Sequence, residues 1–444
     1  MNWMNRREFL KATAATAAVL AGPQWLQAAN TTPGVKPNII LILADDIGIP
    51  GLGCYGGEFT TPHLDNMAKA GMRFDQCFTQ SLCAPSRAML MTGRFPFRTG
   101  AVSNSARSLR PTKETVIPKI LKEAGYATAL AGKWSQMAFM ETAEEGKAWG
   151  FDEFLTWDGA EGGRYWKPSL CRDGKSVAVT EKDFGPDLLN DYVIDFIGRK
   201  KNEPFFVYYP MTLIHSHLYA TPDGKSGRGL LADNIAYMDK LVGKVLSKLD
   251  ELKLRENTLV LFSGDNGLDI GGRMNGRPIS GGKGSLLDGG SRVPLIASWE
   301  GTIPAGKVVN DLVEFSDVYA TLAELSGAKL PAGIQLDSQS FAPQLKGEAG
   351  KPRDWVFIQL ADEWYVRDQH WKLTRAGTLF DMKEAPFKEI QVAPDAADPT
   401  AIAGRKKLQG ILDELRPTGS KRGDREEEGG PAGRKREATK PVQN

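Results

Sequence analysis

From residue 37 onward, short apolar runs rich in β-branched residues alternate with amphipathic segments, and this alternation strongly restricts the possible folds. The apolar runs at residues 38–43, 204–209, 258–262 and 293–298 are expected to be buried strands. The amphipathic segments at residues 64–70, 116–124, 186–198 and 235–252 are expected to be helices. The pattern predicts an α/β fold with a large, mostly parallel sheet flanked by helices on both faces.

With 444 residues, the chain is too long for one typical domain, and the pattern changes near residue 345. We assign residues 37–345 to a large α/β domain and residues 346–415 to a small C-terminal α+β subdomain. Short alternating segments at residues 355–360, 364–367, 371–374 and 378–380 predict a small antiparallel sheet in that subdomain. Residues 418–444 have scarcely any apolar side chains, so we expect this tail to be disordered.

The N-terminus has the order of features expected of an export signal. Arg6 and Arg7 precede an Ala-rich apolar run at residues 12–21, and small residues follow at Ala28 and Ala29. We interpret residues 1–29 as a twin-arginine signal peptide, which makes the twin-arginine export machinery a partner of this chain. The apolar run is too short for a stable membrane span, so we expect an exported protein, periplasmic or extracellular.

The overall charge and the cysteine content narrow the functional classes. A net charge of +2 provides no basic field for nucleic-acid binding, so no nucleic-acid partner is expected. Hydrophobic residues at 41% and charged residues at 25% are typical of a water-soluble globular chain. The four cysteines do not form a disulfide framework, although Cys54, Cys77 and Cys171 leave open either buried thiols or one disulfide.

Polar side chains follow three of the predicted strands directly. Asp45 and Asp46 follow the first strand, His215 and His217 follow the strand at 204–209, and Asp265 with Asn266 follows the strand at 258–262. Because the carboxyl ends of parallel strands meet at one edge of a sheet, these groups should converge there. The carboxylate and amide oxygens predict a site for Ca²⁺ or Mg²⁺ rather than zinc.

The most specific sequence feature is Cys83-Ala84-Pro85-Ser86-Arg87, which fits the Cys-x-Pro-Ser-Arg signal for oxidation of a cysteine to formylglycine. The residues that follow are expected to open a helix. The N-terminus of a helix carries partial positive charge, so an anionic sulfuryl group near Cys83 would be stabilised there.

Together, these motifs resemble those of the type I sulfatases, the formylglycine-dependent arylsulfatase branch of the alkaline phosphatase superfamily. The matching segments cover nearly the whole mature chain in the family's order, at residues 45–48, 83–87, 130–134, 214–217, 264–267, 282–294 and 379–382. The resemblance implies the alkaline phosphatase-like fold and hydrolysis of a sulfated carbohydrate or aryl sulfate. It also implies a formylglycine-generating enzyme as a partner.

The resemblance also implies roles for individual residues. It assigns a cation, Ca²⁺ or possibly Mg²⁺, to Asp45, Asp46, Asp265, Asn266 and an oxygen of modified Cys83. Arg87 and Lys133 would steady the formylglycine hydrate. Lys133, His217 and Lys283 would contact the substrate, and His215 is left open between a substrate contact and loop packing.

One departure from the family pattern affects the expected activity. Ser135 follows Lys133-Trp134 where the family has a histidine that assists the elimination step, and a serine hydroxyl is too weak a base to replace it. Two alternatives to a sulfatase therefore stay open: a phosphonate or phosphodiester hydrolase of the same superfamily, and a turnover-deficient binder of sulfated glycans. Trp157, Tyr165 and Trp166 either stack on sugar rings or pack within the protein.

Overall fold

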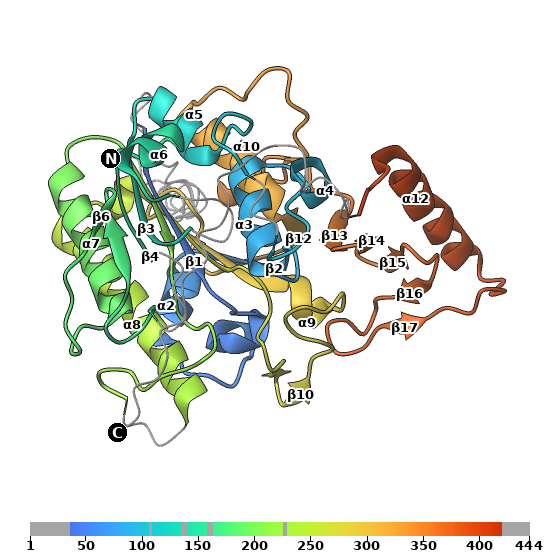
Figure 1. The fold of residues 1–444 in the computed structure, drawn as a ribbon. Helices are drawn as coiled ribbons and strands as arrows, with labels where there is room; N and C mark the ends of the chain where they lie inside the picture. The colour runs from blue at the N-terminus through green and yellow to red at the C-terminus, as the bar shows by residue number, and fades with distance from the viewer. Residues whose placement is uncertain (1–35, 106–108, 135–139, 158–162, 225–228, 420–444) are drawn as a thin grey trace, which may run out of the picture.

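The computed structural model describes residues 36–105, 109–134, 140–157, 163–224 and 229–419. Its main element is a ten-stranded sheet with the order β12-β2-β11-β8-β1-β7-β3-β4-β5-β6 (Figure 1). The strands are β1 (Asn38–Ala44), β2 (Met72–Phe78), β3 (Ala127–Lys133), β4 (Glu153–Trp157), β5 (Leu170–Arg172), β6 (Lys175–Ser176), β7 (Phe205–Pro210), β8 (Thr258–Gly264), β11 (Arg292–Ser298) and β12 (Lys307–Glu314). The signal peptide predicted at 1–29 and most of the tail predicted at 418–444 lie outside the described residues.

The sheet is mostly parallel, as the sequence predicts. Strands β8, β1, β7, β3 and β4 are parallel neighbours, and β12 is parallel to β2. The strand predicted at 293–298 is present as β11, but it runs antiparallel to both of its neighbours, β2 and β8. The parallel block β8-β1-β7-β3 therefore has four carboxyl ends at one edge.

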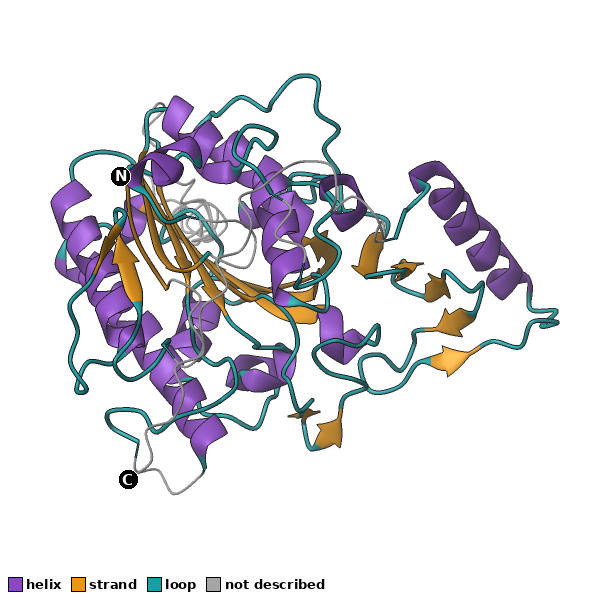
Figure 2. Cartoon of the chain, in the orientation of Figure 1, coloured by secondary structure: helices purple, strands orange, loops and turns teal. Residues whose placement is uncertain are grey.

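Helices cover both faces of this sheet (Figure 2). Alternate residues of β1 point to opposite faces, so Ile40 and Ile42 pack with α2 (Pro62–Ala70), α7 (Gly185–Lys200) and α8 (Leu230–Glu251). Leu41 and Leu43 pack on the other face with α3 (Cys83–Thr92), α5 (Ile117–Glu123) and α10 (Phe315–Ser326). The shorter helices are α4 (Pro96–Thr99), α6 (Ala143–Ala148), α9 (Asp288–Ser291) and α11 (Ala342–Leu345). In the described part of the chain, we find no helix with the length and apolar character needed to span a bilayer.

The C-terminal region forms a second, antiparallel sheet, which lies beside the main sheet in Figure 1. Its strands are β13 (Val356–Leu360), β14 (Glu363–Arg367), β15 (Trp371–Thr374), β16 (Leu379–Asp381) and β17 (Ile390–Gln391). The sequence predicts the first four, and β17 is too short to show a pattern. Helix α12 (Pro399–Leu415) packs Ala401 and Leu408 against Val366 and Leu373 of this sheet.

A buried set of charges joins the C-terminal sheet to the loop that precedes β11. Arg367 Nη1 lies 2.7 Å from Asp288 Oδ1, and Lys372 Nζ lies 2.6 Å from Glu389 Oε2. Glu389 also accepts a hydrogen bond from the backbone N–H of Asp288 at 3.2 Å. All four side chains are at most 3% exposed, so they fix the end of the loop 282–291 in place.

Removing one member of this set should destabilise the protein. In Arg367→Met, the buried Asp288 carboxylate loses its nearest cation and is left with Arg292, whose Nη1 is 3.6 Å away, and the more distant charge of Lys372. A buried charge that loses its partner is costly, so we expect the free energy of unfolding to fall by roughly 3 kcal/mol in chemical denaturation. Arg375→Met removes an exposed arginine in the turn after β15 and should change the free energy of unfolding by less than about 0.5 kcal/mol. Equal effects of the two substitutions would contradict the role given to Arg367.

Candidate active site

The polar residues predicted at the strand ends meet at the carboxyl edge of the parallel block. Asp45 and Asp46 directly follow β1, Asp265 and Asn266 directly follow β8, and Lys133 is the last residue of β3. Backbone hydrogen bonds link their loops: Asp45 N–H donates to Leu213 O at 2.8 Å, and Asp265 N–H donates to Ala44 O at 3.0 Å. The loops after β1, β7 and β8 thus support one another.

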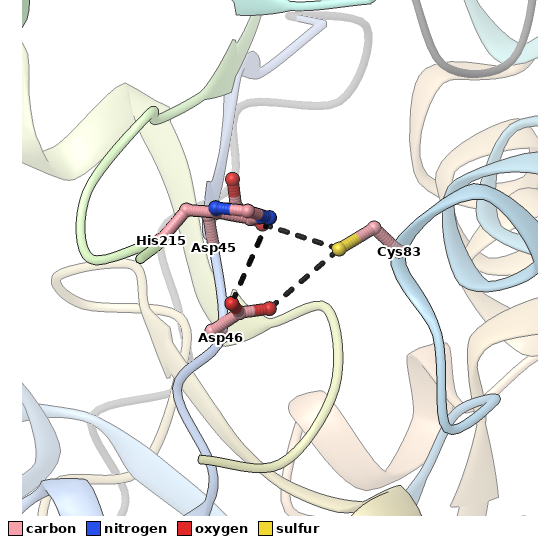
Figure 3. A group of neighbouring side chains, drawn as sticks. All are labelled: Asp45, Asp46, Cys83 and His215. Carbon is pink, nitrogen blue, oxygen red and sulfur yellow. Dashed lines mark hydrogen bonds and ion pairs between the residues drawn. The ribbon is translucent and has the colours of Figure 1, made fainter. Parts of the chain in front are cut away.

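Cys83 faces this edge from the other side of the site, as the first residue of α3 (Figure 3). Its Sγ lies 3.4 Å from Asp45 Oδ1 and 3.6 Å from Asp46 Oδ1, and the side chain is fully buried. Ser86 Oγ donates to Leu82 O at 2.8 Å, which ties the helix to the residue before it. Burial and the nearby carboxylates raise the pKa of the Cys83 thiol well above its usual range, so the unmodified residue is a protonated thiol.

Two buried cations hold the first carboxylate. Lys133 Nζ lies 2.6 and 2.9 Å from the two oxygens of Asp45, and Arg87 Nη2 lies 3.4 Å from Asp45 Oδ1. Burial would raise the pKa of Asp45, but the charges of Lys133 and Arg87 outweigh it and hold that pKa well below its usual range. Asp45 is therefore ionised in the folded protein. Arg87 also contacts Asp265 Oδ2, at 2.8 Å from Nε and 2.7 Å from Nη2.

The second carboxylate takes its partners from two other loops. Lys283 Nζ lies 2.6 Å from Asp46 Oδ2, and Asn266 Nδ2 donates to Asp46 Oδ1 at 2.9 Å. Burial and the neighbouring Asp45 charge raise the pKa of Asp46, and burial raises the pKa of Asp265 although Arg87 opposes it. At two of the three carboxyl groups, burial thus outweighs the stabilisation that the nearby cations give to the ionised form.

The arrangement fits a divalent cation. Asn266 Oδ1 is buried and has no hydrogen-bond partner among the residues that the structure describes, while its Nδ2 is satisfied. A buried oxygen without a donor, beside carboxyl groups with raised pKa values, is what a hard cation with oxygen ligands would stabilise. Ligand atoms of Asp45, Asp46, Cys83 and His215 all lie within 4.8 Å of one another.

The structure brings His215 to the site rather than His217. His215 Nε2 lies 4.0 Å from Asp46 Oδ2, whereas the side chain of His217 is exposed and is not part of the four-residue group around Cys83. Tyr165 holds this loop by donating its hydroxyl to His215 O at 2.6 Å. The assignment of His217 to substrate contact, made from the sequence, stays a prediction, because an exposed side chain on this loop can still meet a bound substrate.

The charge state of His215 follows from its surroundings. Burial and the positive charges of Lys133, Lys283 and Arg164 lower its pKa to about 4, so the imidazole is neutral near pH 7. Sequence reasoning missed Arg164, whose guanidinium lies 4.4 Å from the centre of the Trp157 ring. No motif marks this arginine; only its neighbours in the fold show that its charge acts on the site.

The other predictions near the site have mixed outcomes. Trp157 and Tyr165 are buried, at 4% and 1% exposed, which favours packing over sugar stacking for these two rings. Trp166 is partly exposed and donates its Nε1–H to Ala220 O at 2.8 Å.

Cys54, Cys77 and Cys171 are free, so the alternative of a disulfide between two of them is not realised. Ser135, the departure from the family pattern, lies outside the described residues.

Comparisons with known proteins identify the family of this chain. The sulfatase family model matches residues 37–328. The chain belongs to the sulfatase family. A second model, for the twin-arginine translocation signal, matches residues 4–23, so this sulfatase-family chain carries an export signal.

Relatives and solved structures of the family extend the likeness. The chain is 34% identical to N-acetylgalactosamine-6-sulfatase of Canis lupus familiaris, over 70% of this chain and 66% of that protein. It is 34% identical to arylsulfatase A of Homo sapiens, over 74% of this chain and 72% of that protein. The solved structure of Ps i-CgsB in complex with k-i-k-neocarrahexaose is similar, with a TM-score of 0.74 and 29% identity over 86% of this chain and 92% of that one. The chain thus spans about two thirds to three quarters of the length of these two curated relatives.

Cation binding can be tested through stability. A ligand at one hundred times its dissociation constant adds about 2.7 kcal/mol to the free energy of unfolding, so Ca²⁺ should raise the thermal midpoint, and Mg²⁺ serves as the comparison. Asn266→Leu removes the unpartnered oxygen and should abolish most of the calcium-dependent shift. Asn310→Leu, on the exposed side of β12, should keep it. If Asn266→Leu responds to calcium as the unsubstituted protein does, Asn266 is not a ligand.

Proposed function

We propose that this chain hydrolyses sulfate esters of a carbohydrate, using formylglycine formed from Cys83 and one divalent cation, with Ca²⁺ as the expected ion. The observation that carries the proposal is the position of Cys83. It stands at the N-terminus of α3 with its Sγ 3.4 and 3.6 Å from two aspartates that follow β1. No general role in packing calls for a buried thiol against a pair of buried carboxylates.

The environment of residue 83 favours its modification. A thiol with a raised pKa is a poor nucleophile, so an unmodified Cys83 is badly suited to attack sulfur. A hydrated formylglycine supplies two hydroxyl groups, one to attack and one that allows release of the sulfate. The pentapeptide from Cys83 to Arg87 is the expected signal for a formylglycine-generating enzyme.

The cation is proposed to be held by Asp45, Asp46, Asp265 and Asn266, together with an oxygen of modified residue 83. When bound, such an ion acidifies a coordinated hydroxyl and offsets the negative charge of a sulfate group. The support is the unpartnered Asn266 oxygen and the raised pKa values of Asp46 and Asp265. Oxygen ligands of this kind suit Ca²⁺ or Mg²⁺ better than softer metals.

The lysine and arginine side chains at the site have different roles in this proposal. Lys133 and Arg87 are buried and orient Asp45 and residue 83. Lys283 is partly exposed, at 13%, so its ammonium is available to the nonbridging oxygens of a sulfate ester. Together with the N-terminus of α3, these groups stabilise charge that develops as the ester bond breaks.

His215 is proposed to contact the substrate beside the ester. Its Nδ1 lies against the carbonyl oxygen of Ser216, so the one N–H of the neutral ring is on Nδ1 and the Nε2 that faces the site is an acceptor. The ring borders the carboxylate cluster with 19% of its side chain exposed. We assign to His215 the substrate contact that the sequence resemblance gave to His217.

A carbohydrate is the substrate class best supported. One relative is named for a sulfated amino sugar, and a similar solved structure was determined with a carrageenan-type hexaose. A sulfated-glycan binder without turnover stays the second candidate, because Ser135 replaces a histidine that the family uses in the elimination step.

The central test is the state and the necessity of residue 83. After expression with a formylglycine-generating enzyme, peptide mass analysis should show formylglycine at position 83. The enzyme should turn over 4-nitrophenyl sulfate faster than a 4-nitrophenyl phosphonate ester. Cys83→Ala should lower the rate by at least about 10⁴-fold. Cys77→Ala, at a buried cysteine of β2, should retain activity.

Two results would count against hydrolysis of sulfate esters. Fast phosphonate hydrolysis with negligible sulfate hydrolysis would identify a phosphonate hydrolase. A burst of one alcohol per site without further turnover would identify the turnover-deficient binder.

The two histidines give a further prediction. His215→Ala should lower kcat/KM by roughly 10²-fold, because a side chain that positions the substrate is lost. His217→Ala should lower it by less than about 10-fold, since that side chain is exposed. Steady-state kinetics with 4-nitrophenyl sulfate measure both, and the reverse ranking would restore His217 as the substrate contact.

A further inference from the structure

A cavity of about 550 Å³ opens beside Lys283, outside the cluster around Cys83. It lies within the long loop between β8 and β11, which also forms the hairpin of β9 (Arg273–Met274) and β10 (Arg277–Pro278). Lys283 lines the cavity while its Nζ contacts Asp46 at 2.6 Å. The cavity and the catalytic cluster therefore share one wall.

The other side chains at this cavity combine three kinds of contact. Ile270 is 78% exposed and offers an apolar surface, Arg273 offers a cation, and Asp269 offers a hydrogen-bond acceptor. Sugars present an apolar C–H face and hydroxyl donors, and an anionic sugar also requires a cation. A phenyl ring would use only the apolar surface.

The cavity is also large enough for a ligand bigger than a small alcohol. Its volume is within the range of about 300–1,000 Å³ that ligand sites span. Much of its lining is glycine, including Gly271 and Gly281, whose φ angles of +71° and +81° suit glycine. A Cβ on Gly281 would lie 2.5 Å from Ser285 Oγ, so glycine there lets the loop pack closely on itself beside the cavity.

We infer that this cavity binds the sugar next to the sulfated one, and that Arg273 pairs with an anionic group on that sugar. The inference rests on the proposed function, because it places the scissile sulfate between Lys283 and residue 83. A substrate held there extends past Lys283 into the cavity. The favoured substrate is then an oligosaccharide with a second anionic group, either a sulfate ester or a carboxylate.

Calorimetric titration of the calcium-loaded full chain tests this, in a Cys83→Ala background so that turnover does not consume the ligand. The probes are N-acetylgalactosamine 6-sulfate, a chondroitin 6-sulfate tetrasaccharide and a carrageenan tetrasaccharide. At least one tetrasaccharide should bind about 10-fold or more tightly than the monosaccharide. Tighter chondroitin binding indicates a carboxylate at Arg273, and tighter carrageenan binding indicates a sulfate.

Arg273→Ala should remove most of this advantage, and Ile270→Ala should reduce it several-fold. The matched control is Arg277→Ala, an exposed arginine of the same hairpin whose guanidinium lies 4.0 Å from the centre of the Phe387 ring. Tetrasaccharides that bind no more tightly than the monosaccharide, or an unchanged advantage in Arg273→Ala, would overturn the inference. Binding is measured apart from nitrophenyl sulfate turnover, so a failure of the proposed function would be seen separately.

Discussion

Three buried carboxylates packed within one small volume are the constraint on which the rest of this structure depends. Asp45, Asp46 and Asp265 would repel one another strongly, so the folded state requires compensating charge. Arg87, Lys133 and Lys283 supply it, and formal charges of −3 and +3 give zero for these six side chains. A divalent cation would then leave the site with an excess of two positive charges, which suits a sulfate monoester anion.

The topology explains how these groups meet although they are far apart in sequence. Four parallel neighbours, β8-β1-β7-β3, end at one edge, and each contributes a loop or a terminal residue to the site. Helix α3 packs on the face formed by Leu41 and Leu43 of β1, which brings its first residue over the carboxylates. The geometry of the site thus follows from the packing of the sheet and of one helix.

The sequence predicted the parts of this site that local patterns carry. A polar pair directly after a buried strand must lie at the sheet edge, so Asp45, Asp46, Asp265 and Asn266 were found that way. The pairing of Lys283 with Asp46 spans 237 residues, and no local pattern encodes it. His215 and His217 follow the same strand, and only the path of the loop decides which of them turns inward.

For the sheet, too, local sequence patterns predicted which segments are strands but not the direction in which each strand runs. Residues 293–298 were predicted as a buried strand because they are apolar, but apolarity does not tell direction. The loop before β11 returns along the edge of the sheet, and β11 therefore enters antiparallel between β2 and β8. Helix α12 was not located because only a few of its residues, such as Ala401 and Leu408, are buried.

The loop between β8 and β11 connects the cluster around Cys83 to the cavity proposed to bind the neighbouring sugar. It begins at Asp265 and Asn266, forms the cavity near Arg273, reaches Asp46 through Lys283, and ends at Asp288 in the buried charges of the C-terminal sheet. Both ends of the loop are anchored in buried structure, and Lys283 belongs to the cavity wall and contacts Asp46. A sugar bound in the cavity would therefore be held at a fixed distance from residue 83. The C-terminal sheet contributes no side chain to the group around Cys83, yet through Arg367 and Asp288 it anchors the end of the loop that carries Lys283.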